Sequence, residues 1–237
     1  MAAAWRNRHS IDLMTHSAFC DANHLAQLQL LHLADSALPI GAMAHSFGLE
    51  SLIAEQGLEV ADLEAFFRDW LAGAGMVDAV FCMRAWDANN AEAWSALNAE
   101  LTARKPARES RNASLALGRR FLRLAASLIP DPRLTLAGPA HTATAFGLVS
   151  GVLGIDRAAG AAACLHQSLY GAISVCQRLL PLGQSAAAAL LWNLKPRILE
   201  AVGDAAGREL DELWNPQPLL EMASMRHPRL STRLFIS

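Results

Sequence analysis

LEAFFRDWL, residues 63–71, carries the pattern that decides the fold class. Its large apolar side chains stand at five positions: Leu63, Phe66, Phe67, Trp70 and Leu71. This i, i+3, i+4, i+7, i+8 spacing gathers them on one face of an α-helix. Leucines recur at a similar spacing in residues 25–33. β-branched residues are sparse and no alternating run exceeds a few residues, which argues against a sheet. The sequence predicts an all-α fold.

The same reasoning outlines about ten helices packed into a single compact bundle. Gly57 is placed to cap a helix over 44–56, and Asp156 is placed to begin a long helix through Leu179. Further helices are expected over 76–86, 109–128, 140–153, 185–193, 197–202 and 218–223. We expect a flexible leader over 1–24, a helical domain over 25–224 and a C-terminal docking tail over 225–237. Both Met1 and Met14 remain candidate start residues.

Composition restricts the class of protein. Hydrophobic residues make up 53% of the 237 residues and charged residues only 18%, which indicates a large core or a surface partly covered by other chains. The net charge of −2 does not favour nucleic acid. The four widely spaced cysteines are interpreted as free thiols in a reducing compartment.

Residues 134–155 are apolar and long enough to cross a bilayer, but several features favour a buried helix instead. The window contains Pro139 and four glycines, and no basic cluster flanks it. Gly147, Gly151 and Gly154 would let helix backbones approach closely at the centre of a bundle. We therefore expect no association with a membrane.

Motifs of the common catalytic classes are absent from the sequence. There is no phosphate loop, dinucleotide-binding glycine pattern, nucleophile elbow or HExxH motif. The eight histidines form no local group with metal-ligand spacing, so no stable metal site is predicted. A helical oxygenase-like enzyme is the alternative from another class, but it requires Glu-x-x-His pairs that the chain lacks. We expect a protein with no catalytic residues and no resident cofactor.

Three further stretches stand out. LLHLADSALPIGAMAHSFGLE, residues 30–50, reads as a helix, a Pro-Ile-Gly turn and a second helix. RLLPLGQ, residues 178–184, ends one helix and begins another. MRHPRLSTRLF, residues 225–235, places Leu234 and Phe235 after three arginines, an arrangement that suits a tail docked on another surface.

Together these stretches resemble the UreF family of urease accessory proteins. Residues 35–50, which we call the signature segment, are similar to that family's S-x-x-L-P-[VI]-G-[GA]-[FY]-x-[YH]-S-x-G-L-E pattern, and residues 178–184 to its R-x-x-P-L-G-Q turn. Residues 229–237 resemble its S-R-L-F-x-S ending, and the likeness extends through 108–122, covering roughly 25–237. The chain departs from the pattern at Ala42, Met43 and Thr232.

The resemblance implies an all-α, cytosolic, non-enzymatic scaffold that forms homodimers. It implies binding to a second scaffold protein, UreD (also called UreH), and to the GTPase UreG, in a complex that delivers nickel to apo-urease. The resemblance also implies that the chain modulates GTP hydrolysis by UreG. The alternative is an all-α adaptor for another GTPase or assembly complex.

The resemblance also suggests roles for individual residues. The partner-binding candidates are Arg226, His227, Arg229, Arg233, Leu234 and Phe235 in the tail, and Arg178, Leu182, Gly183 and Gln184 in the turn. The tail would become ordered on meeting the UreD-type partner, with Leu234 and Phe235 as anchors; closing the protein's own core is the alternative. Candidates for the dimer surface or for transient nickel contact are Pro39, Gly41, His45, Ser46, Leu49 and Glu50.

Overall fold

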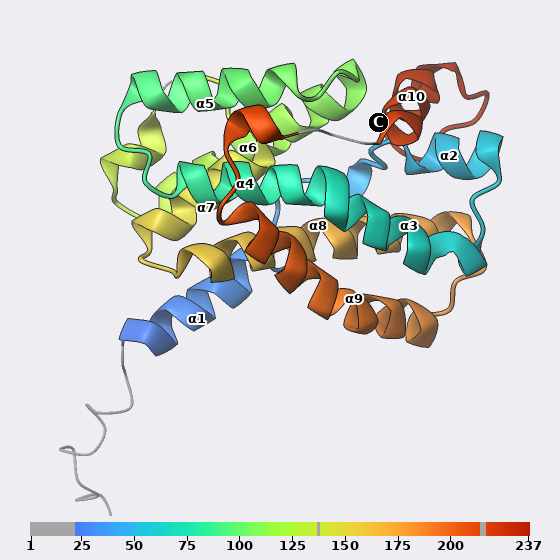
Figure 1. Ribbon diagram of the computed structural model, residues 1–237, viewed down its shortest axis with the longest axis horizontal. Coiled ribbons are helices and arrows are strands. Elements are labelled where there is room, and N and C mark those ends of the chain that lie inside the picture. Colours follow the sequence, from blue (N-terminus) through green and yellow to red (C-terminus); the bar gives the residue numbers. More distant parts are fainter. Residues whose placement is uncertain (1–21, 137, 214–216) are drawn as a thin grey trace, which may run out of the picture.

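The computed structural model describes residues 22–136, 138–213 and 217–237 (Figure 1). Within these ranges the chain forms ten α-helices and no strand. They are α1 (Ala22–Leu33), α2 (Leu49–Gln56), α3 (Leu63–Trp70), α4 (Met76–Ala85), α5 (Ala91–Ala103), α6 (Arg108–Leu128), α7 (Thr142–Val152), α8 (Arg157–Leu179), α9 (Gln184–Ala205) and α10 (Pro218–Arg226). The predicted all-α class is confirmed.

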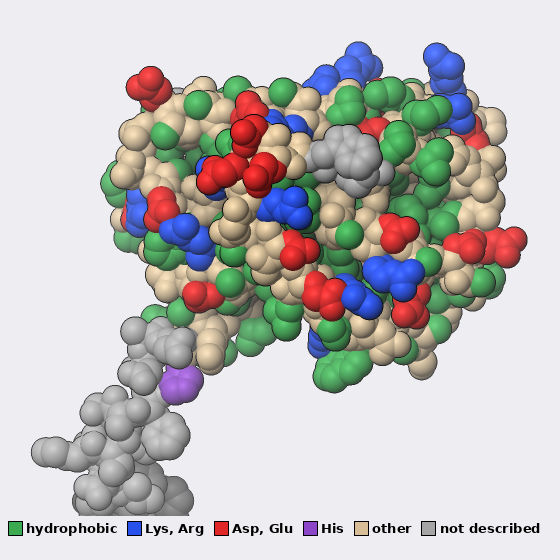
Figure 2. Space-filling view, viewed as in Figure 1, with side chains coloured by type: hydrophobic (Ala, Val, Ile, Leu, Met, Phe, Trp, Pro, Cys, Tyr) green, Lys and Arg blue, Asp and Glu red, His purple; other side chains and the backbone are tan. Residues whose placement is uncertain are grey.

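Helix α7 forms the centre of the bundle and packs against α4, α6 and α8. Helix α9 packs along α8 and α4, while α2 and α10 lie together at one end, where the chain also ends (Figure 1). Figure 2 shows charged side chains of both signs interspersed with hydrophobic ones on the visible face. None of the helices within the described ranges has the length and apolar character needed to cross a membrane.

The expected burial of α7 and its close packing are both confirmed. Phe146, Leu148 and Val149 have no exposed surface. A Cβ added at Gly147 would lie 1.9 Å from the carbonyl oxygen of Cys82, and one at Gly151 would lie 2.0 Å from that of Trp86. Glycine is required at both positions because the backbone of α4 and the residue after it fills the space of a side chain.

The glycines of residues 71–75 do not interrupt the helix that contains them. A π-helical turn, Leu71–Gly75, joins α3 to α4 without a break. Leu71 and Met76 on either side are buried in the core. Their burial offsets the poorer hydrogen-bond geometry of the π-helical turn, so α3 and α4 form one continuous helical segment.

The two helices predicted over 185–193 and 197–202 form a single helix, α9, so that prediction is wrong. Pro196 lies inside α9. A proline removes one helical hydrogen bond and usually ends a helix. Here Leu194 and Ile198 are buried on either side of the exposed Pro196, so packing of this face holds the helix together.

The predicted start of the second helix is also wrong. The helix begins at Leu49 rather than residue 44, because Phe47 and Gly48 have left-handed φ values of 51° and 91° that an α-helix cannot contain. A short 3₁₀ turn, Ala42–Ala44, precedes them. Gly57, with φ of 70°, ends the helix as predicted.

Two N-caps show how side chains set helix starts. Asp156 accepts a hydrogen bond from the Ala159 amide at 2.8 Å, so the predicted start of α8 is confirmed. Asn90 accepts from the Ala93 amide at 2.8 Å and starts α5, a helix that the sequence reasoning did not assign. The fully buried Trp94 anchors α5 to the bundle.

The structure describes the expected tail in full and the expected leader and free cysteines in part. Residues 1–21 of the expected leader lie outside the described residues, and α1 begins at Ala22. Helix α10 runs across the expected start of the tail at residue 225. Cys82, Cys164 and Cys176 are buried free thiols, as predicted; Cys20 lies outside the described residues.

Candidate functional site: the seat of the C-terminal tail

The main chain of the tail binds the signature segment directly. The Ile236 amide donates to the Ala44 carbonyl at 2.8 Å. The main-chain oxygen of Ser237 accepts from the Phe47 amide at 3.1 Å, from the Ser46 hydroxyl at 2.9 Å and from the Ser46 amide. Two stretches that are distant in the sequence therefore form one hydrogen-bonded unit, which we call the tail seat (residues 44–50 with 234–237).

Glu50 is the centre of the tail seat. Its carboxylate accepts hydrogen bonds from Nε2 of His227 at 2.7 Å and from the amides of Leu234 at 2.6 Å and Phe235 at 3.3 Å. Both Glu50 and His227 are buried, with 5% and 1% of their surfaces exposed. A buried carboxylate is tolerated only when hydrogen bonds replace its hydration, and here three donors do so.

Phe235 fills the inner side of the seat. Its side chain is buried in the hydrophobic core, and the Arg178 guanidinium lies 5.6 Å from the centre of its ring. Arg178 also donates to the Met43 carbonyl at 3.3 Å. Arg178 therefore holds the turn of residues 178–184 against both the signature segment and the tail.

The neighbours of Phe235 point the other way. Leu234 and Ile236 have exposed fractions of 61% and 70%. Other exposed side chains nearby are Leu219, Met222 and Met225 on α10, and Arg226, Arg229 and Arg233. Figure 2 shows hydrophobic side chains gathered over α10 at the upper right, with basic side chains beside them. The tail thus has an inner face bound to its own chain and an apolar, cationic outer face.

Gly48 allows α10 to pack against the seat. A Cβ at this position would lie 2.8 Å from the Leu220 carbonyl oxygen and 2.9 Å from the Ser224 amide nitrogen. Its φ of 91° also disfavours any side chain. This glycine of the signature segment is thus explained by the close approach of another helix.

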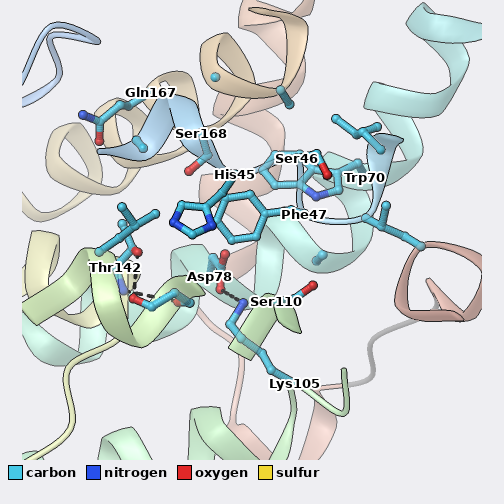
Figure 3. Close-up of a pocket in the computed structure, with 18 of the residues that line it drawn as sticks. His45, Ser46, Phe47, Trp70, Asp78, Lys105, Ser110, Thr142, Gln167 and Ser168 are labelled. Atoms are coloured by element: carbon cyan, nitrogen blue, oxygen red, sulfur yellow. Dashed lines mark hydrogen bonds and ion pairs between the residues drawn. The ribbon is translucent and has the colours of Figure 1, made fainter. Parts of the chain in front are cut away.

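A cavity of about 150 Å³ lies beneath the seat (Figure 3). His45 and Phe47 line it from the signature segment, and the ion pair of Asp78 with Lys105, 2.9 Å between charged atoms, lines it opposite them. Nδ1 of His45 is 2.7 Å from the Ser237 hydroxyl. Burial, together with the charge of Arg120, lowers the pKa of His45, so its imidazole is neutral at pH 7.

A second buried polar cluster supports the cavity wall. His141 contacts the hydroxyls of Thr102 at 2.9 Å and Ser114 at 3.1 Å, and its amide donates to the Asn98 side chain at 3.0 Å. Burial, with smaller contributions from Lys105 and Arg111, lowers the pKa of His141 to about 3. His141 is therefore a satisfied, neutral core histidine.

The structure brings part of the predicted set together. His45, Ser46, Glu50, His227, Phe235 and Arg178 meet in the tail seat. Leu49 and Leu182 are buried in the core. Pro39, Gly41, Gly183 and Gln184 are exposed, and Gly183 and Gln184 stand at the start of α9. His227 and Phe235 thus face inward, whereas Leu234 and the three tail arginines face outward.

Sequence reasoning missed several polar groups of this region. Asp78 stands alone within the apolar run of α4, which was the one available signal for it. Asn98 and Lys105 gave no signal, because their partners, the His141 amide and the Asp78 carboxylate, are distant in the sequence. No group of three or more His, Cys, Asp or Glu side chains suited to a metal ion occurs in the described parts of the chain.

The fold and the site describe an all-helical protein whose main polar site holds a segment of chain through hydrogen bonds. The sequence model of the UreF family matches residues 59–195. A urease accessory protein UreF from Nostoc sp. is 34% identical over 221 residues, covering 89% of this chain and 95% of that protein. One from Rhodopseudomonas palustris BisB5 is 35% identical, covering 94% and 96%, and one from strain HaA2 is 38% identical, covering 85% and 89%. The chain belongs to the UreF family of urease accessory proteins, as the signature segment, turn and tail predicted.

Proposed function

We propose that the protein is a non-enzymatic, cytoplasmic scaffold in urease maturation. It binds a UreD/UreH-type scaffold protein and a UreG-type GTPase as a homodimer, in a complex that delivers nickel to apo-urease and modulates GTP hydrolysis by the GTPase. The two-faced tail is the observation that carries this proposal. It presents Leu234 and Ile236 outward from a backbone that the Glu50 carboxylate holds in place.

The outer face fits a protein partner. The tail and α10 expose leucine, isoleucine and methionine side chains. Their removal from water by a partner would stabilise the complex by about 25 cal/mol per Å² of apolar surface buried. Arg229 and Arg233 have no carboxylate within ion-pair distance among the residues that the structure describes, so they can pair with acidic groups of the partner. We assign this face to the UreD/UreH-type protein.

The inner face gives the tail a defined shape before binding. A segment held by hydrogen bonds loses less conformational entropy on association than a free one, which raises affinity without new contacts. In this proposal Phe235, His227 and Arg178 act by positioning the outer face. Gln184, exposed at the start of α9, is the candidate contact for the GTPase.

Contact with nickel would require a change at the seat. Nδ1 of His45, the Ser46 hydroxyl and the Glu50 carboxylate are hydrogen-bonded to the tail. Transient nickel binding through these three groups would therefore require displacement of the tail. The proposal keeps nickel as cargo and assigns no resident metal.

The experiment is co-purification of the chain with the UreD/UreH-type and UreG-type proteins of the same cell. The variant is L234E/I236E, which places charges on the outer face and leaves the seat intact. The control is V60E/L128E, which places two charges at exposed apolar positions on other elements. Loss of the scaffold protein in the first variant alone is expected. Full complex formation by L234E/I236E would contradict the proposed role of the tail, and absence of both partners from the unaltered chain would contradict the proposed function.

A further inference from the structure

A basic groove lies along the second half of α6, separate from the tail seat. It has a volume of about 560 Å³, and α6 forms one wall while residues 134–136, 138 and 140 form the other. Three arginines line it: Arg119, Arg120 and Arg123. All three are exposed. The groove is therefore open to a ligand from solvent.

The charge of this groove is not neutralised within the described chain. None of the three arginines has a carboxylate within ion-pair distance in residues 22–136, 138–213 and 217–237. The nearby Asp131 is bound by Arg133 at 2.9 Å, and that contact holds the pKa of Asp131 below its ordinary value. Glu109 is the only acidic residue of α6, and it stands in the first turn, far from the groove. A local positive field results in a chain whose net charge is −2.

The arginines divide into two kinds. Arg120 donates to the Ile40 carbonyl at 3.2 Å and so supports the signature segment. Arg119 and Arg123 make no hydrogen bond through their side chains to other described residues. They are four residues apart on a helix, which places them on the same face with their Cβ atoms about 6 Å apart. Two open guanidinium groups on one helix face can each take a carboxylate in a bidentate pair.

The floor of the groove is apolar. Leu122 and Leu134 are buried beneath it, and Leu136 is half-buried at its edge. A free phosphate or a nucleic-acid backbone would gain nothing from this floor, whereas a peptide can place an aliphatic side chain there between its acidic groups. We propose that this groove binds an acidic, leucine-containing segment of a partner protein, with its carboxylates on Arg119 and Arg123. This inference does not depend on the assignment of the tail.

The test measures binding of a defined peptide to the full chain. The probe is a fluorescein-labelled dodecapeptide with six glutamates and three leucines, and the neutral probe has glutamine at each glutamate position. The variant is R119E/R123E. The matched control is R68E/R208E, which makes the same change of charge at two exposed arginines away from the groove. Circular dichroism verifies that both variants are folded.

We expect the acidic peptide to bind the unaltered chain, to bind R119E/R123E at least tenfold more weakly, and to bind R68E/R208E unchanged. The neutral peptide should bind at least tenfold more weakly than the acidic one. Added salt should weaken the binding of the acidic peptide. No binding, equal binding of the neutral peptide, or an equal loss in both variants would overturn the proposal. Tighter binding of a single-stranded DNA dodecamer through Arg119 and Arg123 would overturn it as well, by making the groove a nucleic-acid site.

Discussion

Glu50 and His227 are 177 positions apart in the sequence, and their side chains meet at 2.7 Å inside the protein. The pair links the first turn of α2 to the residues that follow α10. The same carboxylate binds the amides of Leu234 and Phe235. The signature segment and the tail, which resemble separate motifs of the family, are therefore two halves of one site.

Replacement of Glu50 by alanine should release the tail. His227 and two main-chain amides would lose their acceptor, and each buried donor without a partner costs about 1–3 kcal/mol. Because these donors can reach water when the tail leaves, we expect local release rather than global unfolding. Hydrogen exchange at the amides of Leu234, Phe235 and Ile236 should become fast in E50A and stay slow in E64A, which alters an exposed glutamate of α3. Unchanged protection in E50A would show that Glu50 does not hold the tail.

Phe235 and Leu234 should differ sharply when each is replaced by alanine. F235A removes a buried ring and should lower the free energy of unfolding by about 3 kcal/mol. L234A removes an exposed side chain and should change it by less than about 0.5 kcal/mol. The affinity for the UreD/UreH-type partner should fall roughly thirtyfold in L234A if Leu234 is an anchor worth about 2 kcal/mol. Chemical denaturation and a binding titration separate the two effects; equal effects of both variants on stability would contradict the two-faced arrangement.

Gly48 and Gly57 test why the chain has glycine at the two ends of α2. Both have left-handed φ, 91° and 70°. Alanine at Gly57 meets open space, so G57A should cost only about 1 kcal/mol, from its backbone conformation. Alanine at Gly48 meets the backbone of α10 as well, so G48A should be markedly less stable and should displace α10. Thermal unfolding of the two variants gives the comparison, and similar losses would mean that α10 does not pack tightly on Gly48.

Acid should destabilise the protein through His141. Its pKa is about 3 in the folded protein and has an ordinary value of 6.5 in the unfolded chain. The unfolded chain therefore binds a proton between these values that the folded chain does not, and stability falls as pH falls below 6.5. The contribution of His141 is a loss of about 2 kcal/mol between pH 7 and pH 5. The pH slope of unfolding should be shallower in H141Q than in the unaltered chain or in H32Q, a control on the exposed side of α1; an equal slope in H141Q would contradict the buried neutral state.

The sequence predicts most of the helices because an apolar stripe such as that of residues 63–71 has a period that only a helix matches. It predicts the capping roles of Gly57 and Asp156 because those depend on neighbouring residues alone. It did not predict that α9 continues through Pro196, since the packing of Leu194 and Ile198 against distant helices decides that. At Pro196, the burial of neighbouring side chains outweighs the low helix propensity of proline.

The candidate site follows the same division. The tail and the signature segment can be found from their residues and from the resemblance to the family, but their contact cannot. Nothing near Glu50 in the sequence indicates that its partners are His227 and the last residues of the chain. Likewise, Leu234 and Phe235 look equivalent in sequence, and only their positions in the fold make one an outer and the other an inner residue.

The central claim is that the outer face of the tail joins this chain to the urease maturation complex. The most direct measurement is the nickel content and activity of urease purified from a strain lacking this chain and supplied with either the unaltered protein or L234E/I236E. We predict nickel-free, inactive urease in the strain without the chain, full restoration by the unaltered protein and by V60E/L128E, and little restoration by L234E/I236E. Full restoration by L234E/I236E, or nickel-loaded, active urease in the strain that lacks this chain, would contradict the account.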